Sequence, residues 1–334
     1  MVSISFRPCA LAIAAAAVCA SVGGNPCAAQ DASHVQVIPI STITLSDSDA
    51  LLGKNDGAPA TIAGQLRLPR SQAARFPVVL LVHGRGGVSL GHELWANHLN
   101  KLGIATFTLD SYGGRRLAAG FKTDRPLAPF ATIPDVYRAL DMLAHHPRID
   151  ADKIALMGFG SGAIPALYGR LDRFRKAFGS QDAHFAAFIG FYAPCNITLL
   201  DEDQASSAPV RLFHGSADDW LPIVSCREYV AKLAAAKQDI QLREYPGAYN
   251  SFDNPDFTHS LYLGQVQTGR DCHLEERGRG DLVNRDTGKT FDASDACVQT
   301  GVTLAYNHEV TLAARKDVAE FLSGVFHMAP PPDK

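Results

Sequence analysis

The chain has 334 residues, and 46% of them are hydrophobic, a usual proportion for a globular protein that buries a sizeable core. Lys and Arg total 31 and Asp and Glu total 34, which gives a formal net charge of −3 at pH 7. This balance lacks the excess of positive charge found in nucleic-acid-binding proteins, so we discard nucleic acid as a partner. Length alone permits two domains and does not decide their number.

Residues 1–29 have the composition of a secretory signal peptide. Arg7 precedes a largely apolar run over residues 10–22, and small residues follow up to Ala29. A run of 13 residues is shorter than the ~20 that a membrane-spanning helix needs. We therefore expect cleavage after Ala29, export to the periplasm or the medium, and no membrane span in the mature chain.

Four cysteines remain after that cleavage, and an even number in an oxidising compartment favours two disulfides. We predict that Cys195 pairs with Cys226, because both follow the ends of strands that we expect to be neighbours. Cys272 and Cys297 then close a loop in a segment with little core of its own. The spacings do not match a zinc site, so no metal is expected.

Predicted strands and helices alternate along the mature chain. Residues 35–44 and 61–68 have the β-branched and polar alternation of edge or antiparallel strands, with a turn-rich stretch at residues 46–59 between them. Residues 76–82 form a continuous apolar run, which is typical of a strand buried on both faces. We expect further strands at residues 104–109, 153–157, 185–192, 210–214 and 240–245, and helices at residues 91–102, 134–146, 164–178, 224–237 and 308–326.

This alternation predicts an α/β fold with a mostly parallel, doubly wound sheet and helices on both faces. The sequence shows no repeat and no Pro/Ser-rich linker, so residues 30–334 are predicted to be one domain. Residues 253–306 are polar and rich in Gly and Asp, and they stand where a short loop should connect the last strand to the last helix. We interpret them as an excursion over the surface.

Gly158-Phe159-Gly160-Ser161-Gly162 lies between an apolar strand and a predicted helix. Gly-x-Ser-x-Gly in that position is typical of a nucleophile elbow, a tight turn that holds the serine hydroxyl above the sheet. A second glycine-rich turn, His83-Gly84-Arg85-Gly86-Gly87, follows an earlier strand. We expect the backbone N–H groups of Arg85 and Gly162 to form an oxyanion hole, and His83 to be structural.

An aspartate follows the predicted strand at residues 210–214 and suits the acid of a catalytic triad. Asp218 is the preferred candidate over Asp219. Phe213-His214-Gly215 with Asp218, and the segments 220–222, 245–249 and 251–253, resemble the dienelactone hydrolase family of α/β-hydrolases. The similarity extends over residues 77–253 and the last helix. It implies an α/β-hydrolase fold and cofactor-free hydrolysis of a small-molecule ester, lactone or related acyl bond by a nucleophile, an aspartate and a histidine.

The sequence departs from this family at three positions. The founding enzymes have cysteine at the elbow and a glutamate in the oxyanion turn, where this chain has Ser161 and Gly84. These two differences agree, because a serine activated by histidine does not need the thiol arrangement. The third is the catalytic histidine: the family pattern Gly-Ala-x-His-x-Phe reads Gly-Ala-Tyr-Asn-Ser-Phe here, which places Asn250 in the histidine position.

Asparagine cannot accept a proton near neutral pH, so Asn250 cannot be a general base. Three explanations remain open. Another histidine serves the site, with His259 nearest in sequence and His273 and His308 more remote. Alternatively, the protein is a weakened or inactive hydrolase that only binds its ligand, or this chain is a substituted form of a parent that carried histidine.

Substrate-binding residues are expected after the strand at residues 104–109. Tyr112 and Arg115 lie there, at the catalytic edge of such a sheet, and arginine can clamp a carboxylate with two hydrogen bonds. The alternative is a loop anchored by a salt bridge. The substrate and the oligomeric state are not determined by the sequence.

Overall fold

A computed structural model describes residues 35–121 and 127–329 of the chain. The predicted signal peptide, residues 1–29, lies outside the described residues. Within the described part, no helix is both long enough and apolar enough to cross a membrane.

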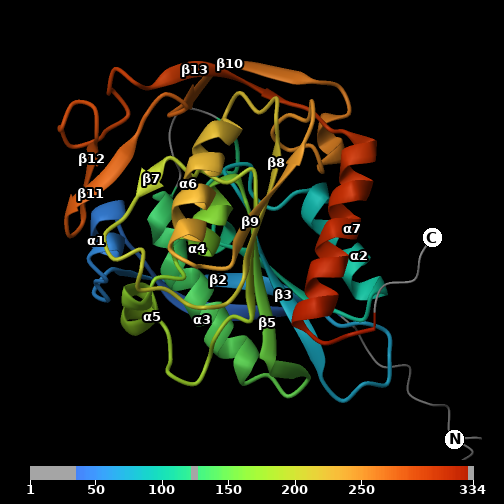
Figure 1. Cartoon of the computed structure of the whole chain (residues 1–334). Coiled ribbons are helices and arrows are strands. Elements are labelled where there is room, and N and C mark those ends of the chain that lie inside the picture. The colour runs from blue at the N-terminus through green and yellow to red at the C-terminus, as the bar shows by residue number, and fades with distance from the viewer. Residues whose placement is uncertain (1–34, 122–126, 330–334) are drawn as a thin grey trace, which may run out of the picture. The chain divides into compact units, whose positions relative to one another are not determined.

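The central feature is an eight-stranded sheet with the strand order β1-β2-β4-β3-β5-β6-β8-β9 (Figure 1). β1 and β2 pair antiparallel with each other, and β2 pairs antiparallel with β4, whereas all later neighbours are parallel. The fold is therefore the mostly parallel α/β-hydrolase sheet that the sequence predicts. Its strands are β1 (Val35–Thr44), β2 (Ala58–Arg67), β3 (Phe76–Val82), β4 (Ala105–Asp110), β5 (Ile149–Phe159), β6 (Ala187–Phe191), β8 (Val210–Gly215) and β9 (Ile240–Tyr245).

Helices cover both faces of this sheet, as the unbroken apolar run of β3 requires. Val78 and Leu80 of β3 belong to one buried cluster, and Val79 and Leu81 belong to the other. Successive side chains of a strand point to opposite faces, so the two clusters are the two sides of the sheet. The first cluster includes residues of α1 (Asp47–Leu51), α3 (Thr132–Ala144), α4 (Ile164–Leu167), α5 (Asp172–Phe178) and α6 (Ile223–Ala235), and the second includes residues of α2 (Leu90–Lys101) and α7 (His308–Val325).

Two predicted segments differ from the observed structure. The turn-rich stretch at residues 46–59 contains the short helix α1, which begins because the Ser46 hydroxyl accepts a hydrogen bond from the Asp49 backbone N–H. The helix expected at residues 164–178 is divided into α4 and α5. Leu171 interrupts it, because its extended backbone forms a β-bridge with Ala205.

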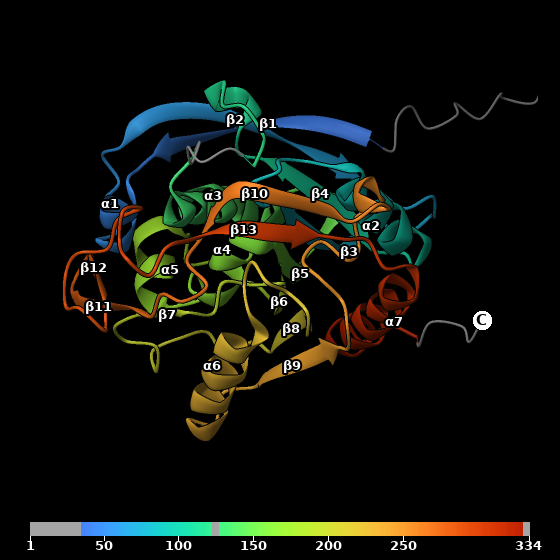
Figure 2. The same ribbon diagram turned by 90° about the horizontal axis from the view of Figure 1, so that it is seen from above.

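The excursion over residues 253–306 has β-structure of its own. It lies over the upper end of the main sheet in Figure 1 and therefore crosses in front of the sheet in Figure 2. β10 (Leu261–Thr268) pairs with β13 (Gln299–Leu304), and β11 (Leu274–Gly278) pairs with β12 (Asp281–Asn284). β11 also pairs with β7 (Ile197–Thr198), a short strand of the hydrolase body. The excursion is thus joined to the body by backbone hydrogen bonds.

Both predicted disulfides are confirmed. Cys195 is bonded to Cys226, and Cys272 is bonded to Cys297. The first bond joins the segment after β6 to α6, and the second closes a loop within the excursion. In the loop-entropy treatment, closing loops with sequence separations of 31 and 25 residues stabilises the folded state by ~3–4 kcal/mol each.

Candidate active site

Ser161 stands in a short turn of 3₁₀ helix, η3 (Gly160–Ala163), directly after β5. The backbone of this turn touches the end of β3 so closely that a Cβ on Gly162 would lie 2.4 Å from the carbonyl oxygens of Val82 and His83. Gly160 adopts φ +54°, a left-handed conformation that glycine takes without a steric penalty. Glycine is therefore required on both sides of Ser161, as the elbow motif predicts.

The glycine-rich turn after β3 lies against this elbow. A Cβ on Gly84 would approach the Phe159 carbonyl oxygen to 2.7 Å. Arg85, the next residue, lines the same cleft as Ser161. The turn that contains Arg85 therefore lies against the elbow that contains Gly162, and an oxyanion hole made by their N–H groups stays a prediction.

His83 holds the oxyanion turn in place. Its Nε2 accepts the backbone N–H of Ser111 at 3.2 Å, so Nδ1 carries the proton and donates it to the Gly84 carbonyl at 2.8 Å. Burial lowers the pKa of His83, and the ring stays neutral. The structural role predicted for His83 agrees with these contacts.

Asp218 is buried at the end of β8 and accepts hydrogen bonds on both carboxylate oxygens. Oδ1 accepts the backbone N–H groups of Trp220 and Leu221, each at 2.9 Å. Oδ2 accepts the side-chain amide of Asn250 at 3.0 Å. The His214 Nε2 atom, which donates to the Leu221 carbonyl at 2.6 Å, also lies 3.2 Å from Oδ2. The carboxylate is therefore fixed in orientation.

Asp219 has a structural role in attaching the excursion. Its carboxylate accepts the backbone N–H and the hydroxyl of Thr303, both at 2.7 Å, and so fastens strand β13 of the excursion. Asp218, the preferred candidate, is thus the aspartate that contacts Asn250.

Asn250 follows β9, is 3% exposed, and lines the cleft with Ser161. Its amide N–H binds Asp218 where a triad histidine would use its Nδ1–H. On the other side, Asn250 Oδ1 accepts the hydroxyl hydrogen of Ser251 at 3.1 Å. Ser251 has φ +61°, a conformation that is strained for a residue with a side chain. Asn250 thus preserves the hydrogen bond to the acid and supplies no base.

The three candidate substitute histidines lie outside the cleft. His259 and His308 are exposed, and His273 is half-buried with its Nδ1 3.1 Å from the Asp286 carboxylate. None of the three lines the cleft. The geometry does not bring them to Ser161.

His92 is the only histidine that lines the cleft among the described residues, and no sequence pattern singles it out. The Ser89 backbone N–H donates to its Nδ1 at 3.1 Å, so Nε2 carries the proton in the neutral ring. Nε2 is buried and has no hydrogen-bond partner within the described part of the chain. Burial lowers the pKa of His92 to about 3. His92 is therefore a neutral donor rather than a base.

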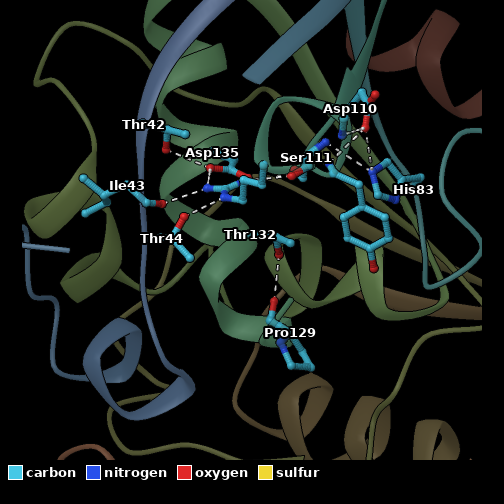
Figure 3. Close-up of polar contacts among 12 residues, drawn as sticks. Thr42, Ile43, Thr44, His83, Asp110, Ser111, Pro129, Thr132 and Asp135 are labelled. Carbon is cyan, nitrogen blue, oxygen red and sulfur yellow. Dashed lines mark hydrogen bonds and ion pairs between the residues drawn. The ribbon is translucent and has the colours of Figure 1, made fainter. Parts of the chain in front are cut away.

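Only one of the two predicted substrate-binding residues lies in the cleft. Tyr112 lines the cleft. Arg115 does not, and its guanidinium is bound to the buried carboxylate of Asp135 by two hydrogen bonds of 2.8 Å. Its other donors bind the Thr44 hydroxyl at 2.8 Å and two backbone carbonyls. Figure 3 shows the cluster around Asp135, with Thr42, Ile43 and Thr44 from β1 on one side and Ser111 on the other.

Arg115 therefore anchors its loop by a salt bridge, which is the alternative to substrate binding that the sequence left open. All five N–H donors of the guanidinium point at protein acceptors, since its planar fork offers no others. The group has no donor left for a substrate carboxylate.

Comparison with known proteins identifies the family and the fold. The model of the dienelactone hydrolase family matches residues 62–262. The chain belongs to this family. No curated protein matches the sequence at a significant level.

Solved structures share the fold at low sequence identity. A protein named m3DLH is 18% identical with a TM-score of 0.56, over 88% of this chain and 99% of its own. The dienelactone hydrolase-like promiscuous phosphotriesterase P91 from metagenomic libraries is 14% identical with a TM-score of 0.51, over 87% and 98%. MGS-M1, an α/β hydrolase from a Medee basin deep-sea metagenome, is 15% identical with a TM-score of 0.50, over 88% and 99%.

One further group lies in the same cleft as Ser161, and its role was not anticipated. Asp253 is buried and accepts the Trp95 indole N–H at 2.6 Å and the Tyr192 hydroxyl at 3.0 Å. Burial raises the pKa of Asp253, whereas the two donors oppose that rise. Asp253 and Tyr192 both line the cleft. In the sequence, Asp253 stands two residues after Ser251, whose backbone is strained. An aspartate in such a turn is ordinarily exposed, so the pattern does not distinguish Asp253 from a surface residue.

Proposed function

We propose that the protein is a serine hydrolase of reduced activity that cleaves an ester, lactone or related acyl bond. The observation that carries this proposal is the Asn250 to Asp218 hydrogen bond of 3.0 Å in the cleft of Ser161. The direction of Asp218 toward Asn250 supports a triad of Ser161, Asp218 and a third position that holds an amide in place of an imidazole.

In the proposed reaction, the Ser161 hydroxyl oxygen attacks the substrate carbonyl carbon. The N–H groups of Arg85 and Gly162 bind the negative oxygen that forms. Asn250 cannot take the serine proton, so the proton passes to water or hydroxide in the cleft. The intermediate then collapses, the bond to the leaving oxygen breaks, and that oxygen takes a proton from water and departs as the alcohol. Attack of water on the acyl-serine releases the carboxylic acid and restores Ser161. The oxyanion hole and substrate binding still favour the reaction, because enzymes that lose a triad member retain ~10³–10⁴-fold acceleration over water.

The alternative function is a binding protein on a hydrolase fold. The size of the cleft and its apolar lining also suit a ligand that is bound and not cleaved. The oriented Asp218 favours the hydrolase, since a binding protein has no use for a carboxylate buried away from the ligand and directed at the position of a base.

Hydrolysis of a chromogenic short-chain ester tests the proposal. The unmodified protein should release the chromophore slowly and above the buffer rate, and Ser161→Ala should return the rate to that of buffer. An organophosphorus serine probe should label Ser161 and no other residue. A slow rate that persists in Ser161→Ala would show that the serine is not the nucleophile, and no rate above buffer would favour the binding protein.

We also propose that the mature chain begins near Gln30 and is exported as a single hydrolase domain. The two disulfides support this, because such bonds persist in oxidising compartments. Mass spectrometry of protein from its native host should find the new N-terminus near Gln30 in the periplasm or the medium. A full-length chain in the cytoplasm would contradict it.

A further inference from the structure

The cleft that contains Ser161 is much larger than a small ester needs. Its volume is about 790 Å³, which lies in the upper part of the range of ~300–1,000 Å³ typical of sites for drug-sized ligands. The lining also includes residues of α1, β7 and the β11–β12 hairpin, between the hydrolase body and the excursion, and we call this the distal part. Side chains of the distal part are mostly apolar, namely Leu51, Phe130, Ile197, Leu282 and Phe291.

The excursion forms one wall of this distal part, and it is fixed to the body. Glu276 in the middle of β11 has a fully buried carboxylate that accepts hydrogen bonds from both Nη groups of Arg173, at 2.9 and 2.6 Å. It also accepts the backbone N–H groups of Leu200 and Gly280. A Cβ on Gly280 would lie 2.7 Å from Leu52, so the β11–β12 turn rests directly on the end of α1. Figures 1 and 2 both show β11 and β12 beside α1.

These contacts hold the β11–β12 hairpin of the excursion firmly against the hydrolase body. A carboxylate that is buried with four donors is costly to separate from them. The Cys272 to Cys297 disulfide restrains the same segment. The distal part of the cleft is therefore preformed, which lowers the entropic cost of binding a long ligand.

Charge in the cleft disfavours an anionic ligand. Aspartates at positions 47, 253, 256, 281 and 292 line it, and the arginines and lysines among the described lining residues are Arg85 and Arg279 only. Arg279 is paired with Asp201 at 2.6 Å. Arg85 donates weakly to the Gln267 carbonyl at 3.4 Å and lies 5.8 Å from the Trp220 ring centre. Arg115, the expected carboxylate clamp, is bound to Asp135.

We propose that the substrate is an uncharged ester with a long apolar chain, and that the chain binds in the distal part between α1 and the β11–β12 hairpin. The proposal rests on the proposed function for the site of cleavage. Burial of the chain against Leu282 and its apolar neighbours supplies the binding energy. A carboxylate in the distal part would lose its water beside Asp47, Asp281 and Asp292, where the nearby cation Arg279 is already paired with Asp201.

Direct binding tests this without any turnover. Calorimetry in the Ser161→Ala variant should give dissociation constants for 1-hexanol, 1-octanol and 1-decanol that fall about fourfold per added methylene, the equivalent of ~0.8 kcal/mol each. Decanoate has the length of decanol and a negative charge, and it should bind weaker by on the order of tenfold or more. Equal affinities across the alcohols, or tighter binding of decanoate, would overturn the proposal.

The position of the ligand's alkyl chain in the cleft is tested by substitution and by labelling. Leu282→Asp should weaken decanol binding about tenfold or more by putting a charge into the distal part. The matched control is Leu261→Asp on the exposed face of β10 in the same excursion, and it should leave binding unchanged. Equal effects of the two substitutions would overturn the assignment.

Photolabelling covers the case in which Leu282→Asp does not fold. A decanol analogue with a diazirine at the chain end should attach to peptides of residues 274–293 or of α1 in the unmodified protein. Labels confined to other peptides would overturn the placement. If binding depends on the length of the alkyl chain but no Ser161-dependent cleavage is found, this inference holds and the proposed function is refuted. If cleavage is found but binding does not depend on that length, the proposed function holds and this inference is refuted.

Discussion

Replacement of Asn250 by histidine should convert the site into a complete triad. The Asn250 amide N–H already donates to Asp218 at 3.0 Å, and an imidazole Nδ1–H can make the same bond. The acid needs no reorientation, because two backbone N–H groups fix its other oxygen. The new Nε2 would extend toward the cleft, which Asn250 and Ser161 both line.

The expected gain in rate follows from the role of the missing group. General-base assistance contributes ~10²–10⁴-fold, which corresponds to about 3–5 kcal/mol of transition-state stabilisation. Substrate contacts elsewhere in the cleft are unchanged, so the gain should appear in kcat with little change in KM. The substitution loses the Ser251 hydrogen bond to the asparagine oxygen and should lower stability by about 1 kcal/mol.

Hydrolysis of a chromogenic short-chain ester measures this gain. The pH profile of Asn250→His should rise through a pKa near or above ~6.5, since the imidazole must be neutral to accept the proton. Asn254→His is the matched control, because it adds a histidine to the same cleft without contact with Asp218. If NMR shows the new imidazole bonded to Asp218 and kcat does not rise, the proposed assignment of the site is refuted.

Three other predictions use the same chain. Added imidazole should accelerate ester cleavage by the unmodified protein and have little effect on Asn250→His, and equal acceleration of both would contradict a missing base. Joint replacement of Cys272 and Cys297 by serine should lower stability by ~3–4 kcal/mol and weaken decanol binding more than hexanol binding, which denaturant titration and calorimetry can check. The pKa of His92 is about 3 in the folded protein, below its value of ~6.5 in the unfolded chain. The contribution of His92 to the free energy of unfolding is therefore complete above pH ~6.5 and is lost as the pH falls toward 3. We expect His92→Gln to reduce the fall in the free energy of unfolding between pH ~6.5 and pH ~3.

The sequence was a good guide to the sheet, because burial on both faces leaves a local signature. The predicted strands at residues 35–44, 76–82 and 240–245 have the observed bounds of β1, β3 and β9. The positions of Ser161 and Asp218 after strands β5 and β8 also followed from the chain, since parallel strands bring their carboxyl ends to one edge of the sheet.

The environment of individual polar groups could not be derived in this way. The neutral His92 depends on burial by residues distant in sequence, and the fixed excursion depends on Glu276 meeting Arg173 across 103 positions. Such pairings leave no periodic pattern. The same limit applies to Arg115, whose position after the strand at residues 104–109 suggested a substrate clamp. Its partner Asp135 lies 20 positions away on α3, and no sequence pattern joins the two.

Replacement of Arg115 distinguishes the anchor from the clamp. The Asp135 side chain is fully buried, and without the guanidinium it keeps only the Thr42 hydroxyl at 2.7 Å. Arg115→Met should therefore destabilise the fold by about 3–5 kcal/mol in a denaturant titration, the cost of leaving a buried carboxylate unpaired. Arg115→Met with Asp135→Leu removes both charges and should recover most of that loss. Neither variant should change KM for esters at temperatures where it is folded, because Arg115 does not line the cleft. An unchanged stability together with a KM that rises only for carboxylate-bearing esters would show that Arg115 binds substrate.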